Sequence, residues 1–297
     1  MAKELYVDKN FKAPALKKIE QINKIVKAYH AKGFDLTLRQ VFYQLVATVI
    51  IENTERSYKN TGTLINDARL AGLIDWNAIV DRTRNIRQRS HWETPREIIE
   101  AVTQQYYKDK WENQETYIEV WVEKDALIGL VQSACHNLDV TCFSCRGFVS
   151  QSAMYEAAKR INSKPHQNKI IFHLGDHDPS GIDMTRDIKE RLEMFECEVD
   201  IDRIGLTMAQ IEEYQPVPNP AKLTDSRARG YIEKYGVSSW ELDALEPEVL
   251  TELIRTSIEP LIDQDALQAI KDEESHERSL LAHIGDTIDE IDEAFRN

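Results

Sequence analysis

The stretch Lys-Ile-Ile-Phe-His-Leu-Gly-Asp-His-Asp-Pro-Ser-Gly, residues 169–181, decides the fold that this sequence predicts. Its apolar run at 170–174 is typical of a buried strand, and the Pro-Ser-Gly at its end predicts a turn. Two acids, Asp176 and Asp178, lie between the strand and the turn. Ligands of open α/β sheets bind outside the carboxyl ends of the strands, which is where we expect this pair.

A third acid is expected beside this pair. The run Tyr-Ile-Glu-Val-Trp-Val at 117–122 is also strand-like, and it leads directly into Glu123 and Lys124. About fifty residues separate Glu123 from Asp176, which is enough for two βα crossovers that return to a neighbouring parallel strand. Three carboxylates at one sheet edge repel one another unless a cation lies between them, and Mg²⁺ prefers such oxygen ligands. The alternative for Asp176 and Asp178 is an Asp-rich surface turn.

Strands and helices alternate over residues 116–215, which predicts an α/β domain with a parallel sheet and flanking helices. The expected strands are 117–122, 140–145, 170–174 and 199–204, and the expected helices are 127–136, 152–161 and 182–195. A proline-containing stretch begins the last part of the chain, 216–297, which is otherwise acidic and amphipathic. We expect this part to be a C-terminal helical extension.

The chain before the sheet favours a separate helical domain. Apolar residues recur at helical spacing over 1–32, a second helix is expected from Thr37 as its N-cap, and a third at 53–69. Short helices in this order suit a winged-helix-like DNA-binding module. In the second helix Tyr43 follows Arg39 by four residues, so the two side chains are neighbours on the flank of the apolar stripe. An ordinary core-flanking tyrosine is the alternative for Tyr43.

The net charge of −14 is unevenly distributed. Residues 1–115 hold 19 Lys and Arg against 15 Asp and Glu, whereas the remainder holds 18 against 36. A basic first part suits a polyanion bound by that domain. Its densest basic run contains Arg82, Arg84, Arg87 and Arg89. Because arginine binds phosphate in bidentate fashion, we expect these residues to contact DNA; a solvated helical face is the alternative.

Several classes of protein are disfavoured by the sequence. No apolar run is long enough to cross a membrane and the start lacks the apolar stretch of a signal peptide, so a cytoplasmic location is expected. The four cysteines lack a second pair at zinc-ligand spacing, so we expect reduced thiols. No Gly-x-x-x-x-Gly-Lys-Ser/Thr motif occurs, so no ATP site is expected in this chain.

One glutamate at a strand end and an Asp-x-Asp at another resemble the Toprim domain of topoisomerases, primases and related nucleases. The ordered motifs Val-Glu-Lys-Asp-Ala (122–126), Arg-Gly-Phe (146–148) and Gly-Asp-His-Asp-Pro-Ser-Gly (175–181) look most like one branch of that group. This branch holds the A subunit of topoisomerase VI and the transesterase that starts meiotic recombination. The short length resembles the stand-alone Mini-A relatives of bacteria, phages and plasmids, which implies a prokaryotic, phage or plasmid source.

The resemblance extends into the first domain. Relatives carry a tyrosine nucleophile in a helix written roughly Arg-Asp-(Val/Ile)-(Phe/Tyr)-Tyr, and Arg-Gln-Val-Phe-Tyr at 39–43 is similar to it. Tyr43 falls on the nucleophile position and Arg39 on the arginine, which would stabilise a phenolate. Gln40 departs from the usual acid. The likeness covers most of residues 30–260.

The resemblance implies a mechanism and partners. Mg²⁺, or Mn²⁺ in its place, would be held by Glu123, Asp176 and Asp178 and would assist the attack of Tyr43 on a phosphate of double-stranded DNA that Lys124 contacts. The products would be a 5′-phosphotyrosyl link and a free 3′ hydroxyl. In relatives the tyrosine and the acids of one centre come from opposite protomers, which implies a homodimer that makes double-strand breaks. A separately encoded ATPase subunit is a further implied partner.

Three functions remain open at this point. The first is tyrosine transesterification of DNA, as in an A subunit of a type IIB topoisomerase. The second is a metal-dependent Toprim endonuclease that hydrolyses DNA without a tyrosine link. The third is a catalytically idle DNA-binding subunit of a larger complex.

Overall fold

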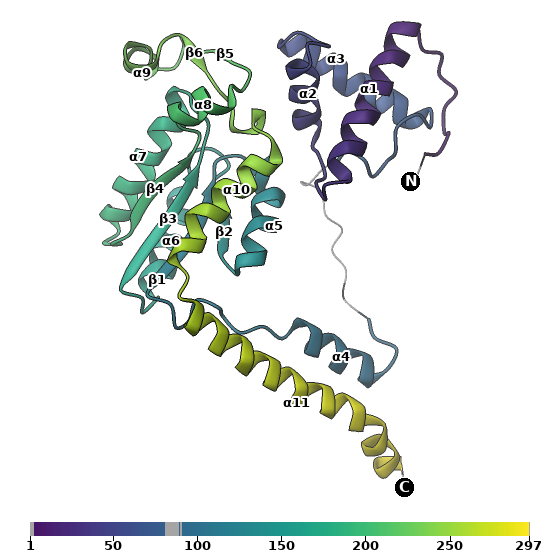
Figure 1. Cartoon of the computed structure of the whole chain (residues 1–297), viewed down its shortest axis with the longest axis vertical. Helices are drawn as coiled ribbons and strands as arrows, with labels where there is room; N and C mark the ends of the chain where they lie inside the picture. Colours follow the sequence, from purple (N-terminus) through teal and green to yellow (C-terminus); the bar gives the residue numbers. More distant parts are fainter. Residues whose placement is uncertain (1–2, 81–88, 90, 297) are drawn as a thin grey trace.

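The structure, a computed structural model, describes residues 3–80, 89 and 91–296. Figure 1 shows a group of N-terminal helices beside a sheet that carries helices on both faces, and a two-helix arm that extends away from the sheet. This architecture confirms the predicted α/β class, with N-terminal helices before the sheet and a long helix at the C-terminus. Within the described residues, no helix is both long and apolar enough to cross a membrane.

The N-terminal group consists of α1 (Ala13–His30), α2 (Leu38–Ala47) and α3 (Glu55–Leu70). These helices share one apolar core, to which α1 contributes Ile22 and α2 contributes Leu45. Thr37 is the N-cap of α2, as predicted, and it forms a capping box with Gln40: the Thr37 N–H donates to Gln40 Oε1 at 2.9 Å. Gln40 therefore has a role in starting the helix. Over residues 3–80 the extended segments make only isolated bridges.

The sheet is parallel throughout and has the strand order β2-β1-β3-β4. The sequence predicted every one of these strands. The strands are β1 (Thr116–Val122), β2 (Thr141–Ser144), β3 (Asn168–Leu174) and β4 (Asp200–Gly205), and the helices between them are η1 (Asp125–Leu127), α5 (Ile128–Leu138), α6 (Gln151–Asn162) and α7 (Pro179–Met194). Val122 pairs with Leu174, so the chain leaves β1 and β3 at neighbouring points of the sheet edge.

Side chains of β1 alternate between two buried faces, because successive residues of a strand point to opposite sides. Val120 and Val122 pack with α5 and α10 (Pro247–Ile258), whereas Tyr117 and Trp121 pack with α6 and α7. Every residue of β1 is buried. The strand that carries Glu123 is therefore held from both sides and can position that acid rigidly.

The chain after β4 forms several further helices and a short two-stranded sheet, and part of it packs on the parallel sheet. It forms α8 (Met208–Tyr214), β5 (Asn219–Pro220), α9 (Ala228–Tyr235), β6 (Ser238–Ser239), η2 (Leu242–Ala244), α10, η3 (Glu259–Leu261) and α11 (Gln264–Arg296). Because α10 packs on the sheet, the core of the sheet continues beyond residue 215, where the sequence suggested a boundary. Helix α4 (Pro95–Gln105) lies along α11 and forms the arm with it (Figure 1).

His173 on β3 makes stability depend on pH. Its side chain is fully buried, its ring Nδ1 lies 2.8 Å from the Thr185 hydroxyl, and burial together with the charge of Arg203 lowers its pKa to about 3. The unfolded state therefore binds a proton below about pH 6.5 that the folded state refuses. We expect the free energy of unfolding to fall as the pH drops from about 6.5 towards 3, by up to about 1.4 kcal/mol per pH unit from this residue.

Urea denaturation at about pH 7 and pH 5 measures this effect, and His173→Asn supplies the control because it keeps a polar group near the position of Nδ1. The variant should lose less stability between the two pH values than the wild-type chain. Equal losses in both chains would contradict the prediction.

Candidate functional site

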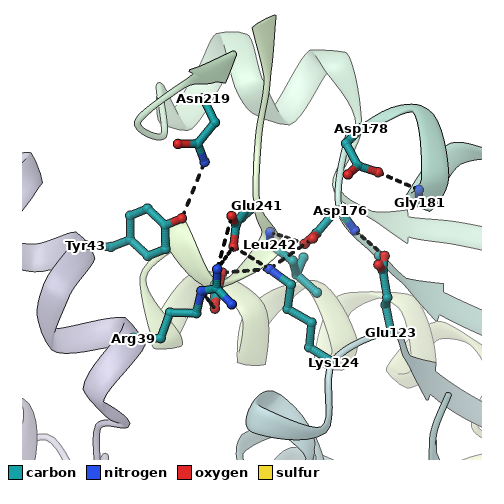
Figure 2. A network of polar contacts seen from close by, with 12 residues as sticks. Arg39, Tyr43, Glu123, Lys124, Asp176, Asp178, Gly181, Asn219, Glu241 and Leu242 are labelled. Carbon is teal, nitrogen blue, oxygen red and sulfur yellow. Dashed lines mark hydrogen bonds and ion pairs between the residues drawn. The ribbon is translucent and has the colours of Figure 1, made fainter. Parts of the chain in front are cut away.

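A cavity of about 630 Å³ lies between the N-terminal helices and the carboxyl edge of the sheet. Arg39 and Tyr43 line it from α2, and Glu123 and Lys124 line it from the end of β1. Asp176 and Asp178 line it from the loop after β3. In Figure 2 Lys124 reaches Asp176, whereas Asp178 points to Gly181 and the Tyr43 hydroxyl points to Asn219. The structure therefore brings the predicted tyrosine, arginine, lysine and acids of a single chain to one cavity.

The loop after β3 is tight because two glycines let it approach Glu123. The Asp176 N–H donates to Glu123 Oε2 at 2.9 Å. A Cβ atom at Gly181 would lie 2.2 Å from the carbonyl oxygen of Asp176, and one at Gly175 would lie 3.0 Å from Glu123 Oε2. The loop after β3 therefore leaves room for the Glu123 side chain only because residues 175 and 181 carry no side chain.

Asp178 has a structural role that the sequence analysis did not foresee. It is the N-cap of α7, and its Oδ1 accepts a hydrogen bond from the Gly181 N–H at 2.6 Å. A carboxylate at this place is stabilised by the free N–H groups and the dipole of the helix. One oxygen of Asp178 is therefore already engaged by the protein.

Asp176 is buried and both of its oxygens have partners. Oδ1 accepts from the Leu242 N–H at 2.8 Å, and Oδ2 lies 3.0 Å from Lys124 Nζ. Burial raises the pKa of Asp176 to about 7, although the neighbouring Lys124 opposes this shift. Burial also raises the pKa of Glu123. Both carboxyl groups are thus poorly solvated and gain from a nearby cation.

The three acids suit a hard cation in kind, since they offer only oxygen atoms and line one cavity. Among the described residues, however, no three His, Cys, Asp or Glu side chains already stand in an arrangement that could hold a metal ion. In this arrangement Lys124 and backbone N–H groups engage the oxygens of Asp176 and Asp178.

Tyr43 is buried, with only 4% of its surface exposed, and its ring meets that of Phe42 edge to face. Asn219 Nδ2 donates to its hydroxyl at 3.4 Å. Burial, with the nearby charge of Glu241, raises the pKa of Tyr43 to about 12. The phenol is therefore protonated at neutral pH in this arrangement, and its hydroxyl faces polar groups of the cavity.

The cations Arg39 and Lys124 share two carboxylate partners that the sequence analysis missed, Glu241 and Asp243. Arg39 Nη2 lies 3.1 Å from Glu241 Oε2, and its Nε lies 3.3 Å from Asp243 Oδ2. Lys124 Nζ lies 2.7 Å from Glu241 Oε2 and 3.0 Å from Asp243 Oδ1. Burial disfavours the charge on Lys124, but Asp243, Asp176 and the other acids outweigh it and raise the lysine pKa.

Arg203 on β4 is a further residue that the sequence analysis missed. It donates to the carbonyl oxygens of Gly175 at 2.8 Å, Asp176 at 2.6 Å and Gly181 at 2.9 Å. These bonds hold the loop that carries the two aspartates. They also place a partly buried positive charge next to the acids, which lowers their mutual repulsion.

Most of the arginines of the predicted basic run lie outside the residues that the structure describes. Arg82, Arg84 and Arg87 lie outside the described residues, and Arg89 is exposed. Contacts between these arginines and DNA stay a prediction.

The fold and the site define a class: an α/β protein with acidic and cationic side chains gathered at the carboxyl edge of a parallel sheet. Comparison with protein-family models found no match to this chain, and comparison with curated proteins found none either.

Proposed function

We propose that this chain cleaves double-stranded DNA by Mg²⁺-dependent tyrosine transesterification, as a homodimeric relative of topoisomerase VI A subunits that works with a separate ATPase subunit. The observation that carries the proposal is that Tyr43, Arg39 and three acids line one cavity of about 630 Å³. The proposal includes a Toprim-type sheet domain and a winged-helix-like first domain. The strand order supports the first, and the group of helices α1, α2 and α3, of which α2 bears Tyr43, supports the second.

In the proposed reaction Tyr43 Oη attacks the phosphorus of a phosphodiester. A bond forms between Oη and phosphorus, the bond from phosphorus to the 3′ oxygen breaks, the phenolic proton passes to water, and the 3′ oxygen takes up a proton. The product is a 5′-phosphotyrosyl link. Arg39, four residues before the tyrosine on α2, stabilises the phenolate and the developing charge on phosphate. Glu123, Asp176 and Asp178 would hold Mg²⁺, which would supply further neutralisation of phosphate charge.

Hydrolysis without a tyrosine link is the second candidate, and one observation favours it. The Tyr43 hydroxyl is buried and its pKa is raised to about 12, which makes it a weak nucleophile at neutral pH. In that case Glu123 and the two aspartates would serve attack by water, and Tyr43 would only line the cavity.

Cleavage of supercoiled plasmid distinguishes the two candidate reactions. The wild-type chain, incubated with Mg²⁺ or Mn²⁺ and stopped with detergent, should yield linear DNA that enters a gel normally only after protease digestion. Glu123→Ala should lower the cleavage rate by at least about 100-fold, the loss typical of removing one group that stabilises charge. Glu252→Ala, which removes an exposed carboxylate of α10, is the matched control.

Linear DNA that is free of protein before protease treatment would favour hydrolysis. Normal cleavage by the Glu123→Ala chain would contradict both enzymatic candidates and would leave the DNA-binding subunit.

A further inference from the structure

Residues 241–248, here called the acidic segment, join β6 to α10 beside the N-terminal helices (Figure 1). The acidic segment carries four carboxylates, those of Glu241, Asp243, Glu246 and Glu248. Two of them bind at the end of α1: the Tyr29 hydroxyl donates to Glu246, and Lys32 Nζ lies 2.6 Å from Glu248. The other two bind Arg39 on α2. The acidic segment therefore attaches the N-terminal helices to the sheet through polar and charged groups, beside the apolar contacts of Phe34.

Glu241 stands where two cations converge. A single oxygen, Oε2, lies 3.1 Å from Arg39 Nη2 and 2.7 Å from Lys124 Nζ (Figure 2). One guanidinium and one ammonium around a single anionic oxygen is also how proteins bind a phosphate oxygen. Asp243, which is 2% exposed, completes the pair of carboxylates around the same two cations.

This arrangement opposes DNA cleavage in three ways. Arg39 and Lys124 are both neutralised, so neither attracts a phosphate. Lys124 also holds Asp176, one of the three acids. The charge of Glu241 adds to burial in keeping Tyr43 protonated. The conformation described is thus a resting one with respect to the proposed chemistry.

We propose that Arg39 and Lys124 form a binding position for a DNA phosphate, and that the Glu241 and Asp243 carboxylates occupy it in the resting chain. The backbone of DNA then competes with the acidic segment for the same two cations. When phosphate displaces the carboxylates, Lys124 turns from Asp176 to DNA and Arg39 loses its contacts with the acidic segment. This inference rests on the proposed function in taking DNA as the ligand, and it adds a device that restrains the site until DNA binds.

Competition of this kind lowers the affinity for DNA, because part of the binding free energy is used to separate the acidic segment from the cations. Removing one competing charge should therefore strengthen binding. Glu241 is the suitable position, since its side chain is partly exposed, whereas Asp243 is fully buried and its replacement threatens folding. Glu241→Gln keeps the size of the side chain and one accepting oxygen, and removes the negative charge.

Fluorescence anisotropy with a labelled DNA duplex, in the presence of a metal chelator, measures binding without cleavage. We expect Glu241→Gln to bind about tenfold more tightly than the wild-type chain. Glu252→Gln, which removes an exposed charge on α10 that pairs with Arg255, should bind as the wild-type chain does. Unchanged or weaker binding by Glu241→Gln would overturn the proposal, and so would equal strengthening by both variants, because that would be an effect of net charge alone.

Hydrogen exchange supplies a second readout that needs no variant. DNA should increase exchange at the backbone amides of residues 240–248 in the wild-type chain, and protection that is unchanged or greater there would overturn the proposal. Both measurements are independent of cleavage. If Tyr43→Phe cleaves DNA normally while Glu241→Gln binds more tightly, the tyrosine chemistry fails and the competition stands; the reverse pair of results rejects the competition alone.

Discussion

The Tyr43→Phe chain is expected to bind DNA as the wild-type chain does and to leave no protein attached to DNA ends. The change removes one oxygen, which accepts a hydrogen bond from Asn219 Nδ2 at 3.4 Å, so the fold should lose little. If the phenol is the nucleophile, covalent adducts should fall by at least about 1,000-fold, since the attacking oxygen is missing. Detergent-stopped plasmid cleavage followed by gel analysis with and without protease gives the measurement.

Tyr58→Phe is the matched control for that experiment. Tyr58 lies on α3, lines the same cavity, and its ring packs edge to face on Phe42. It should form adducts at the wild-type rate. A Tyr43→Phe chain that still forms adducts would remove Tyr43 from the mechanism. Mixing Tyr43→Phe chains with Glu123→Ala chains then locates the acids: adducts reappear only if the tyrosine of one protomer works with the acids of its partner.

Glu119→Ala is expected to destabilise the sheet domain by about 2–4 kcal/mol, because two buried hydrogen-bond donors lose their acceptor and a partly exposed arginine loses its partner. Glu119 is fully buried in the middle of β1. It accepts hydrogen bonds from the Tyr117 hydroxyl at 2.7 Å, from Trp121 Nε1 at 2.8 Å, and from Arg160 Nε and Nη2 at 2.8 and 2.9 Å. Alanine would leave the Tyr117 and Trp121 donors without an acceptor inside a core, and it would remove the carboxylate that the partly exposed Arg160 contacts.

Denaturant unfolding followed by circular dichroism measures this loss. The double replacement Glu119→Leu with Arg160→Met is the control, because it removes both charges and keeps apolar volume. It should unfold closer to the wild-type chain than Glu119→Ala does. If Glu119→Ala unfolds like the wild-type chain, the buried network contributes nothing to stability.

The sequence predicted the elements of this fold well because their signals are local. Apolar runs of strand length, followed by helical periods, located the four strands of the parallel sheet. Thr37 was predicted as an N-cap from its place before an apolar period, and the structure confirms it. The sequence also predicted that Glu123 and Asp176 leave neighbouring strands, since two crossovers fit between them, and the pairing of β1 with β3 bears this out.

What the sequence could not predict are the partners of the charged groups. The partners Glu241 and Asp243 are 117 and 119 residues away from Lys124, and Glu241 is 202 residues away from Arg39. The hydrophobic pattern of a sequence predicts contacts over only a few residues and cannot predict contacts at such separations. Asp178 is a related case, because its spacing from Asp176 suits a metal ligand and a helix N-cap equally well, and only the backbone of α7 makes it a cap.

The amino-acid sequence by itself determined the order of strands and helices and the set of polar side chains at the end of each strand, because hydrophobic period and turn chemistry act over a few residues. Only the tertiary structure decided that Tyr43 faces acids of its own chain, that Lys124 holds Asp176, and that Glu241 lies between the two cations. The physical reason is that electrostatic pairing depends on distance in space, which packing of the N-terminal helices against the sheet sets.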